Sequence, residues 1–414
     1  QNSHTILIEL TMRPLILSIF LLIALNCTSN KEYSVKEFTS PSGENASLPR
    51  LFTDNTGTVF LSWVESKGDT SSLFYSKLDD DQWSKPKLIA KSDSWFVNWA
   101  DFPSVIGKDG KAVAAHWLQK VPGGTYAYNV NIAGSANDWE NVLTPHKDNT
   151  PTEHGFVSLT PASDSTFLSI WLDGRNTAGS GGHESHTSGL SSAMTLRSAF
   201  INNDLKIEES FLIDASVCDC CGTAAVKTKN GFIAAYRDRT EDEIRDIYIS
   251  RFMNGKWEKP VSVHDDNWEI AACPVNGPAI AAQGQTLAVA WYTGAGDTTR
   301  VKLAFSNDEG KSFETPVLLD NGNPLGRVDV EFISNNEVLV SWMERNMENR
   351  SKAFFVAKRI STDGEIQKEF EFSLMESSRK SGFPQISSYK NSIIAAWADV
   401  SDQNSSKIKV AILE

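Results

Sequence analysis

Short apolar runs recur along most of the chain, and nearly all of them follow a turn and end in an aromatic side chain, as in "GTVFLSW", "TLAVAW" and "EVLVSW". Successive aromatic ends lie 51 to 65 residues apart. The seven ends are Trp63, Trp117, Trp171, Tyr236, Trp291, Trp342 and Trp397. A period of this length, kept over so many copies, is typical of a repeat architecture.

The segments around each run repeat as well. An upstream segment often begins at Pro, as in "LPRLF" and "FPSVI", and an alternating segment follows the aromatic, as in "DIYISRF" and "VKLAFS". Several copies add a stretch that opens with an aromatic residue and a Pro, as in "KWEKPVSV". Short runs rich in Val, Ile, Phe and Tyr between turns predict a four-stranded antiparallel sheet. A repeated sheet of this kind is one blade of a β-propeller.

The predicted fold class is therefore all-β: a β-propeller of four-stranded blades, with seven blades, or with six if one copy belongs to an insertion. The last copy stops at Glu414 after its third strand, and "EYSVKEF" at residues 32–38 forms an extra strand ahead of the first copy. We expect this N-terminal strand to complete the seventh blade and close the ring, because closure removes two exposed sheet edges.

The N-terminal region predicts export. We expect residues 1–11 to lie upstream of the native start at Met12, and residues 12–26, with one Arg and a short apolar run, to form a signal peptide. Cys27 stands where a lipoprotein signal places its lipid-modified cysteine; cleavage nearby, with Cys27 an unpaired thiol, is the alternative. Residues 27–45 then provide the lipid tether and closing strand, and residues 46–414 the propeller. The predicted location is the cell envelope, in the outer membrane or periplasm.

The charge of the chain restricts its partners. Its formal net charge is −13 and its pI is about 5.1. An acidic protein of this kind is not expected to bind nucleic acid or an anionic membrane surface. We therefore expect contact with a membrane only through the lipid anchor, and a small ligand, a metal ion or a glycan as the partner at the propeller mouth.

One motif and several shorter strings resemble a known family. "SNDEGKSF" at residues 306–313 matches the Asp-box pattern, and "CDCCGT" and "CPVNGP" are similar to strings in exported bacterial sialidase-like propellers, also described as BNR-repeat proteins. The resemblance covers nearly all of the chain after residue 45. In that family the Asp-box is a structural turn between the third and fourth strands, remote from the active site. The resemblance therefore implies a fold and not an activity.

The alignment of the copies indicates which residues meet at one mouth of the channel. In an antiparallel blade, the start of strand one and the end of strand two lie at the same end, where propeller loops converge. The positions two residues after the aromatic are mostly acidic. They are Glu65, Gln119, Asp173, Asp238, Thr293, Glu344 and Asp399. Such a mouth would suit a cation, although a feature shared by most blades is usually part of the fold.

Residues that break the repeat are better candidates for binding. Glu153 and Asp329 reach the mouth by the same alignment, and the Gly/Ser-rich stretch 178–189 adds His183 and His186 on an extended loop. The candidate ligand-binding residues are Asp101, His116, His154, Asp173, Arg175, Arg237 and Arg327.

Cysteines gather at the same mouth. Cys218, Cys220 and Cys221 precede strand one of the fourth copy, and Cys273 precedes strand one of the fifth. Adjacent strands lie about 5 Å apart, so these side chains can meet. Three interpretations remain open: one or two disulfides in an oxidising compartment, reactive thiols, or a copper or zinc site that also takes ligands from His116 and His154.

The resemblance to sialidase-like proteins also implies an alternative function, an exo-α-sialidase-type glycoside hydrolase acting on an anionic glycan. Such an enzyme needs arginines for the substrate carboxylate, a Tyr nucleophile with a Glu partner, and an acid. The candidate catalytic groups are Asp101, Glu344 and Arg237. The family's early Arg-Ile-Pro motif is missing, since Leu48-Pro49-Arg50 puts Arg after Pro. The leading hypothesis is a ligand- or metal-binding propeller; an interaction scaffold with structural disulfides is the third.

Overall fold

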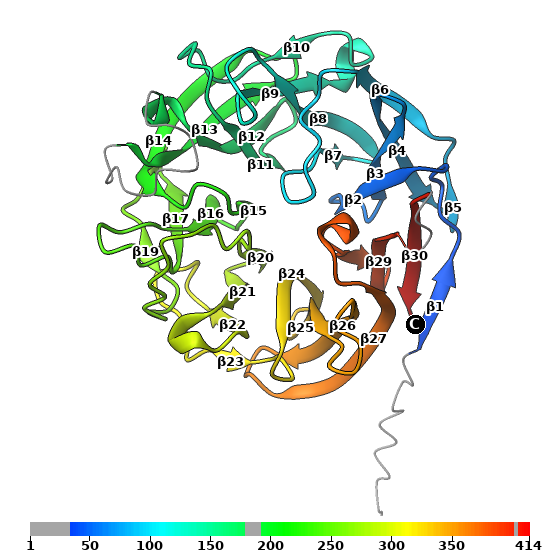
Figure 1. Ribbon diagram of the computed structural model, residues 1–414, viewed down its shortest axis with the longest axis vertical. Coiled ribbons are helices and arrows are strands. Elements are labelled where there is room, and N and C mark those ends of the chain that lie inside the picture. The colour runs from blue at the N-terminus through cyan, green and yellow to red at the C-terminus, as the bar shows by residue number, and fades with distance from the viewer. Residues whose placement is uncertain (1–33, 179–191, 401–404) are drawn as a thin grey trace, which may run out of the picture. The chain divides into compact units, whose positions relative to one another are not determined.

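The computed structural model describes residues 34–178, 192–400 and 405–414. They form a ring of seven antiparallel sheets, each running outward from the centre (Figure 1). The prediction of an all-β propeller with seven four-stranded blades is confirmed. The predicted signal peptide and Cys27 lie outside the described residues, as do His183 and His186.

The first three blades occupy the chain up to residue 217. Blade 1 contains β2 (Ala46–Thr53), β3 (Val59–Lys67), β4 (Thr70–Asp79), β5 (Gln82–Trp83) and β6 (Lys87–Ser92). Blade 2 contains β7 (Ser104–Lys108), β8 (Lys111–Lys120), β9 (Tyr128–Gly134) and β10 (Val142–Leu143). Blade 3 contains β11 (His154–Pro161), β12 (Thr166–Asp173), β13 (Met194–Asn202) and β14 (Ile207–Val217).

The remaining blades follow in chain order. Blade 4 contains β15 (Ala224–Lys227), β16 (Phe232–Arg237), β17 (Ile247–Met253), β18 (Lys256–Trp257) and β19 (Val261–Ser262). Blade 5 contains β20 (Ala279–Gln283), β21 (Thr286–Thr293), β22 (Arg300–Ser306) and β23 (Val317–Leu318). Blade 6 contains β24 (Pro324–Ser334), β25 (Glu337–Arg345), β26 (Lys352–Ser361) and β27 (Ile366–Glu376). Blade 7 contains β28 (Gln385–Tyr389), β29 (Ser392–Asp399), β30 (Lys407–Leu413) and β1 (Val35–Phe38).

The two ends of the described ring lie in one sheet. β1 pairs antiparallel with β30, so that Val35 lies opposite Leu413 and Phe38 opposite Val410. The innermost strands contact each other in sequence around the ring, from β2 through β7, β11, β15, β20 and β24 to β28, which contacts β2. This ring of first strands surrounds the central channel.

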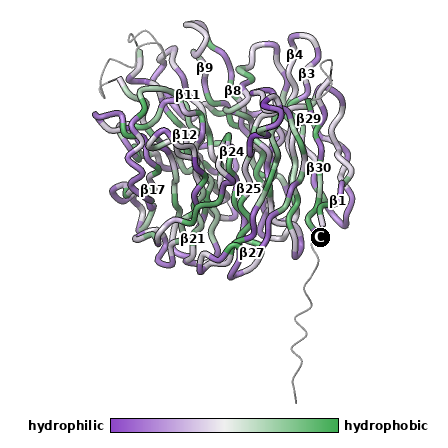
Figure 2. Tube along the Cα trace, turned by 60° about the horizontal axis from the view of Figure 1, so that its bottom comes forward, coloured by the Kyte–Doolittle hydropathy of each residue, from purple (hydrophilic) through white to green (hydrophobic). Residues whose placement is uncertain are grey.

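The hydrophobic core lies between neighbouring blades. Each aromatic-ended run is the second strand of its blade, and Trp63, Trp291 and Trp342 are fully buried. One hydrophobic cluster joins blades 4 and 5 and another joins blades 5 and 6. Because both faces of a second strand are covered, these strands are continuously apolar instead of alternating. Figure 2 shows the corresponding hydrophobic stretches along the strands.

The Asp-box string forms a hydrogen-bonded turn between β22 and β23. Asp308 Oδ1 accepts the backbone N–H of Ser312 at 3.0 Å, and Ser306 Oγ accepts that of Gly310 at 2.8 Å. The turn thus joins the third and fourth strands of blade 5, as the resemblance implies. Within the described ranges, no helix has the length and hydropathy needed to cross a membrane.

Candidate functional site

The first strands surround a central cavity of about 140 Å³, with Asp101, Arg50 and Gln385 in its wall. Asp101 Oδ1 accepts the backbone N–H of Phe156 at 2.8 Å. This approach requires glycine at position 155, where a Cβ atom would lie 2.0 Å from Asp101 Oδ2. Burial, with the nearby carboxylate of Glu153, raises the pKa of Asp101 to about 8. Asp101 is therefore largely protonated at neutral pH.

A buried tyrosine connects Asp101 to Glu153. The Tyr128 hydroxyl donates a hydrogen bond to Glu153 Oε1 and lies 3.4 Å from Asp101 Oδ2. Burial and the two acidic neighbours raise the pKa of Tyr128 well above its ordinary value. A tyrosine in this state is a hydrogen-bond donor and a poor nucleophile.

The arginines predicted at the mouth bind the protein itself. Arg237 Nη2 donates to the carbonyls of Asn276 at 2.8 Å and Tyr292 at 2.7 Å, and Arg237 Nη1 donates to the carbonyl of Arg245 at 2.6 Å. Arg327 Nη1 donates to the carbonyl of Gly382 at 2.8 Å. Both guanidinium groups are buried and join loops of neighbouring blades.

The shared acids of the mouth accept hydrogen bonds from the aromatic ends of the second strands. The indole N–H of Trp342 donates to Glu344 Oε2 at 2.7 Å, and that of Trp171 donates to Asp173 Oδ2 at 3.0 Å. Glu344 Oε1 also accepts the backbone N–H of Asn323 at 2.7 Å. In blades 1, 3 and 6 the acid two residues after the Trp thus satisfies a buried indole donor, whereas the indole of Trp291 donates to Asp266. This explains why the pattern recurs from blade to blade.

His116 lies in neither of the two groups of metal-ligand side chains that the described residues contain. Its Nδ1 atom is 2.9 Å from Ser104 Oγ, and the side chain is completely buried. Burial and the positive charge of Arg50 lower the pKa of His116 to about 3, so the ring is neutral.

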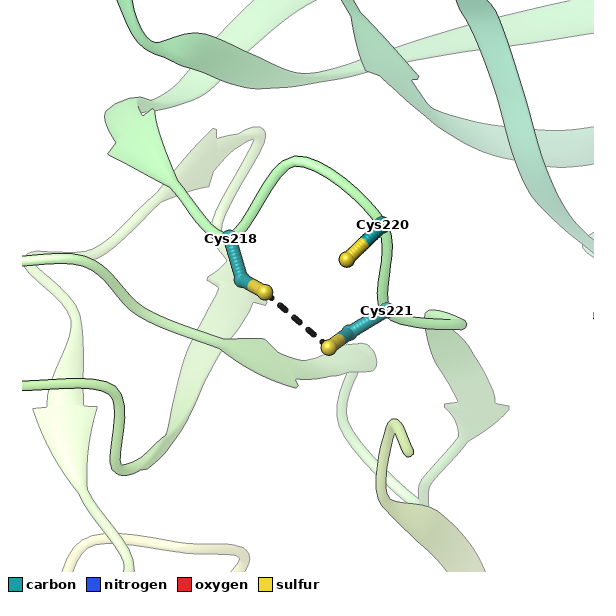
Figure 3. A group of neighbouring side chains, drawn as sticks. All are labelled: Cys218, Cys220 and Cys221. Atoms are coloured by element: carbon teal, nitrogen blue, oxygen red, sulfur yellow. Dashed lines mark hydrogen bonds between the residues drawn. The ribbon is translucent and has the colours of Figure 1, made fainter. Parts of the chain in front are cut away.

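Three buried thiols form a cluster in the loop between β14 and β15 (Figure 3). The sulfurs of Cys218, Cys220 and Cys221 all lie within 4.8 Å of one another, and those of Cys218 and Cys221 are 3.0 Å apart. The Cys273 side chain hydrogen-bonds Cys220 from the adjacent blade. We call these four residues the thiol cluster. No disulfide links the four cysteines in the described part of the chain, which corrects the disulfide interpretation.

Two glycines allow the loops that carry the thiol cluster to approach. A Cβ atom at Gly277 would lie 1.9 Å from the carbonyl oxygen of Gly222. Gly222 follows Cys221 directly, and Gly277 follows Cys273 by four positions. The "CCG" and "CPVNG" strings therefore pack backbone against backbone, and this contact brings the cysteines of blades 4 and 5 together.

A buried arginine sets the charge of the thiol cluster. Arg245 Nη1 lies 3.5 Å from Cys218 Sγ, and Arg245 Nη2 donates to Glu243 Oε2 at 2.7 Å. Burial alone raises the pKa of Cys218, but hydrogen bonds from Cys220 and Cys221 and the charge of Arg245 bring it well below its ordinary value. Burial raises the pKa values of Cys220 and Cys221. Among the three buried thiols, the thiolate form is therefore favoured at Cys218 and the neutral form at Cys220 and Cys221.

His154 belongs to the second of the two groups. Its ring stacks on His146 with centroids 3.7 Å apart and an interplanar angle of 2°, and its Nε2 atom lies 3.2 Å from Asp148 Oδ2. The sequence analysis missed His146 and Asp148, although the spacing of "HKDNTPTEH" was a visible signal. Asp173 and Arg175 join this group, as described below.

Comparisons with known proteins match the chain to solved structures at low sequence identity. No protein-family model and no curated protein matches the chain. A Hadza microbial sialidase matches with a TM-score of 0.42 and 15% identity over 72% of this chain and 63% of its own.

Two further solved structures are similar. For an oligogalacturonate lyase from Vibrio parahaemolyticus the TM-score is 0.48 and the identity 10%, over 92% of this chain and 94% of that one. For a prolyl endopeptidase the TM-score is 0.43 and the identity 12%, over 86% of this chain and 45% of that one. The chain thus spans less than two thirds of the endopeptidase and of the sialidase. The protein is a seven-bladed β-propeller whose structural neighbours include glycoside hydrolases and peptidases.

Proposed function

We propose that this chain is an exported propeller lipoprotein that binds a soft metal ion, with Cu(I) as the best-matched ion, through the thiol cluster at the channel mouth. The observation that carries the proposal is the convergence of three buried sulfurs within 4.8 Å. Sulfurs bound to one ion at about 2.3 Å each lie no more than about 4.6 Å apart. A small adjustment of the loop would therefore place all three on a single ion.

The charge of the thiol cluster favours a soft monovalent ion. Arg245 stabilises one thiolate at Cys218, while burial disfavours further negative charge on Cys220 and Cys221. A monovalent ion on few thiolates leaves little net charge in a buried site, where net charge is expensive. Thiolate ligands select Cu(I) over harder ions, and each thiol that binds the ion loses its proton.

An anionic-glycan hydrolase is the second candidate function. Asp101, with its raised pKa, favours it, because such an enzyme uses a protonated acid. The Tyr128–Glu153 pair does not, because the raised pKa of Tyr128 makes it a poor nucleophile. The arginines weigh against it, since Arg237 and Arg327 donate to backbone carbonyls instead of presenting donors to a ligand. A fluorogenic sialoside assay tests this candidate, and turnover that is lost in D101N would support it.

Anaerobic titration of the reduced chain with Cu(I), in competition with a chromogenic chelator, tests the metal-binding proposal. We expect the chain to withdraw one Cu(I) per molecule from the chelator and C218S/C221S to lose at least about 100-fold in affinity, because removal of two ligands exceeds the 10- to 100-fold loss typical of an outer-shell change. H116Q is the control, since His116 lies outside the thiol cluster. Equal affinities for all three proteins would contradict the proposal.

A further inference from the structure

The second group of metal-ligand side chains lies between blades 2 and 3. His146 and Asp148 come from the segment between β10 and β11, His154 is the first residue of β11, and Asp173 is the last residue of β12. His154 and Asp173 are direct partners across these two strands. The side chains of His154 and Asp173 are completely buried, and those of His146 and Asp148 are 3% and 8% exposed.

The two separations from Asp148 are close to the edge of a metal tetrahedron, and the separation of Asp173 from His154 is longer. Asp148 Oδ2 lies 3.2 Å from His154 Nε2 and 3.4 Å from His146 Nδ1, and Asp173 Oδ1 lies 3.7 Å from His154 Nε2. Bonds of about 2.0–2.1 Å from a metal ion to nitrogen and oxygen place neighbouring ligands about 3.3–3.4 Å apart in a tetrahedron. One ion can bind these groups once one of the two stacked imidazole rings turns, because each ring binds a metal within its own plane and the two planes are parallel.

The hydrogen bonds of His154 direct its other nitrogen into the group. Its Nδ1 atom lies 3.2 Å from the carbonyl oxygen of Thr152 and 3.3 Å from that of Tyr128. Carbonyls only accept hydrogen bonds, so Nδ1 carries the proton, as it does in most metal-bound histidines. Nε2 then faces Asp148 Oδ2, and neither atom has a hydrogen-bond partner among the described residues. Two buried acceptors at 3.2 Å repel each other unless a proton or a metal ion lies between them.

We propose that His146, Asp148 and His154, with Asp173, form a second metal site that takes a borderline divalent ion such as Zn²⁺ or Co²⁺. Imidazole and carboxylate ligands suit such ions, whereas thiols suit soft ones. The site uses none of the residues of the thiol cluster. If the ion binds His146 at Nδ1, the ring proton moves to Nε2. His146 Nε2 then no longer accepts the hydrogen bond that the N–H of Val130 donates at 3.3 Å.

Arg175 occupies the position that the ion would take over. Its guanidinium donates to both oxygens of Asp173 at 2.7 Å, and Arg175 Nη2 lies 3.4 Å from Asp148 Oδ2. The Arg175 side chain is 27% exposed, so it can move into solvent when an ion binds. Arg175 thus balances the negative charge of the two carboxylates in the metal-free protein and competes with the ion for them. Removal of the Arg175 side chain should therefore tighten metal binding.

Co²⁺ titration of the purified chain tests the proposal, because the absorption spectrum distinguishes nitrogen and oxygen ligands from thiolates. We expect ligand-field bands without thiolate-to-cobalt charge transfer, and the same bands in C218S/C221S. Failure of copper binding at the thiol cluster would leave this result unchanged. We expect H154Q to weaken Co²⁺ and Zn²⁺ binding by about 100-fold or more. H264Q is the matched control, since His264 is half-exposed and lies 3.7 Å from Asp266, outside the site.

R175Q provides a test that does not depend on a loss of function. We expect it to bind Zn²⁺ about tenfold more tightly than the unmodified chain, because it removes a positive charge within a few ångströms of the ion. Far-UV circular dichroism of the metal-free variants checks their folding. If H154Q and H264Q bind Co²⁺ equally, or if R175Q leaves the affinity unchanged, the group is only an ion-paired cluster of Arg175 with the two carboxylates and the proposal is overturned.

Discussion

The contact between Gly222 and Gly277 predicts a large difference between two otherwise similar substitutions. A Cβ atom at position 277 would lie 1.9, 2.6 and 2.8 Å from the carbonyl oxygen, carbon and nitrogen of Gly222. All three are backbone atoms, so the loop cannot yield by turning a side chain. To restore ordinary contacts, the loops of blades 4 and 5 would have to separate by more than about 1 Å, and this would draw Cys273 away from Cys220. Overpacking of this kind costs about 1–3 kcal/mol.

The matched control is G222A, because a Cβ atom at position 222 meets nothing within 4 Å. We expect G277A to lower the free energy of unfolding by about 1–3 kcal/mol and to weaken Cu(I) binding, while G222A changes neither by much. Chemical denaturation followed by tryptophan fluorescence measures the stability, and the anaerobic chelator competition measures the affinity. Similar behaviour of the two variants in both assays would refute the argument that this close approach assembles the thiol cluster.

Three further outcomes follow from the structure. Burial raises the pKa of Asp101 to about 8, so the folded chain keeps a proton that the unfolded chain loses above about pH 4. The free energy of unfolding should therefore fall as pH rises from about 4 to about 8, by at most about 1.4 kcal/mol per pH unit. Denaturation curves of D101N should show a smaller dependence on pH. R237K should lower the free energy of unfolding by about 2–4 kcal/mol, because an ammonium group cannot serve the carbonyls that Arg237 joins; a loss below about 0.5 kcal/mol would count against that role. W342F should lower the free energy of unfolding by about 1–3 kcal/mol in the same assay, because Glu344 loses its indole donor. An unchanged free energy of unfolding would contradict the structural role of the shared acids.

The repeat could be predicted because of where the second strands lie. A strand with a blade on each side must be apolar on both faces, and this leaves a continuous run that is visible in the sequence. The aromatic end of each run packs between blades, as Trp63 and Trp342 do. The alignment on these ends also predicted that Cys273 could meet Cys220 or Cys221, because equivalent positions of adjacent blades lie side by side, and in the structure Cys273 hydrogen-bonds Cys220.

The partners of individual side chains could not be predicted from that alignment. The alignment places Arg237 and Arg327 near the mouth. It cannot predict that both guanidinium groups donate to backbone carbonyls of neighbouring loops. His154 was predicted to join the cysteines, whereas the structure stacks it on His146. His146 and Asp148 lie on the connection between β10 and β11, and these blade-to-blade connections differ in length and sequence, so only the local spacing of the two residues could have indicated them.

X-ray absorption spectroscopy at the copper edge of the Cu(I)-loaded chain shows directly whether the thiol cluster binds the ion. We expect a first shell of sulfur alone, from the thiol cluster, with no nitrogen or oxygen neighbour. A first shell that contains nitrogen or oxygen, or copper that is lost on gel filtration, would contradict it.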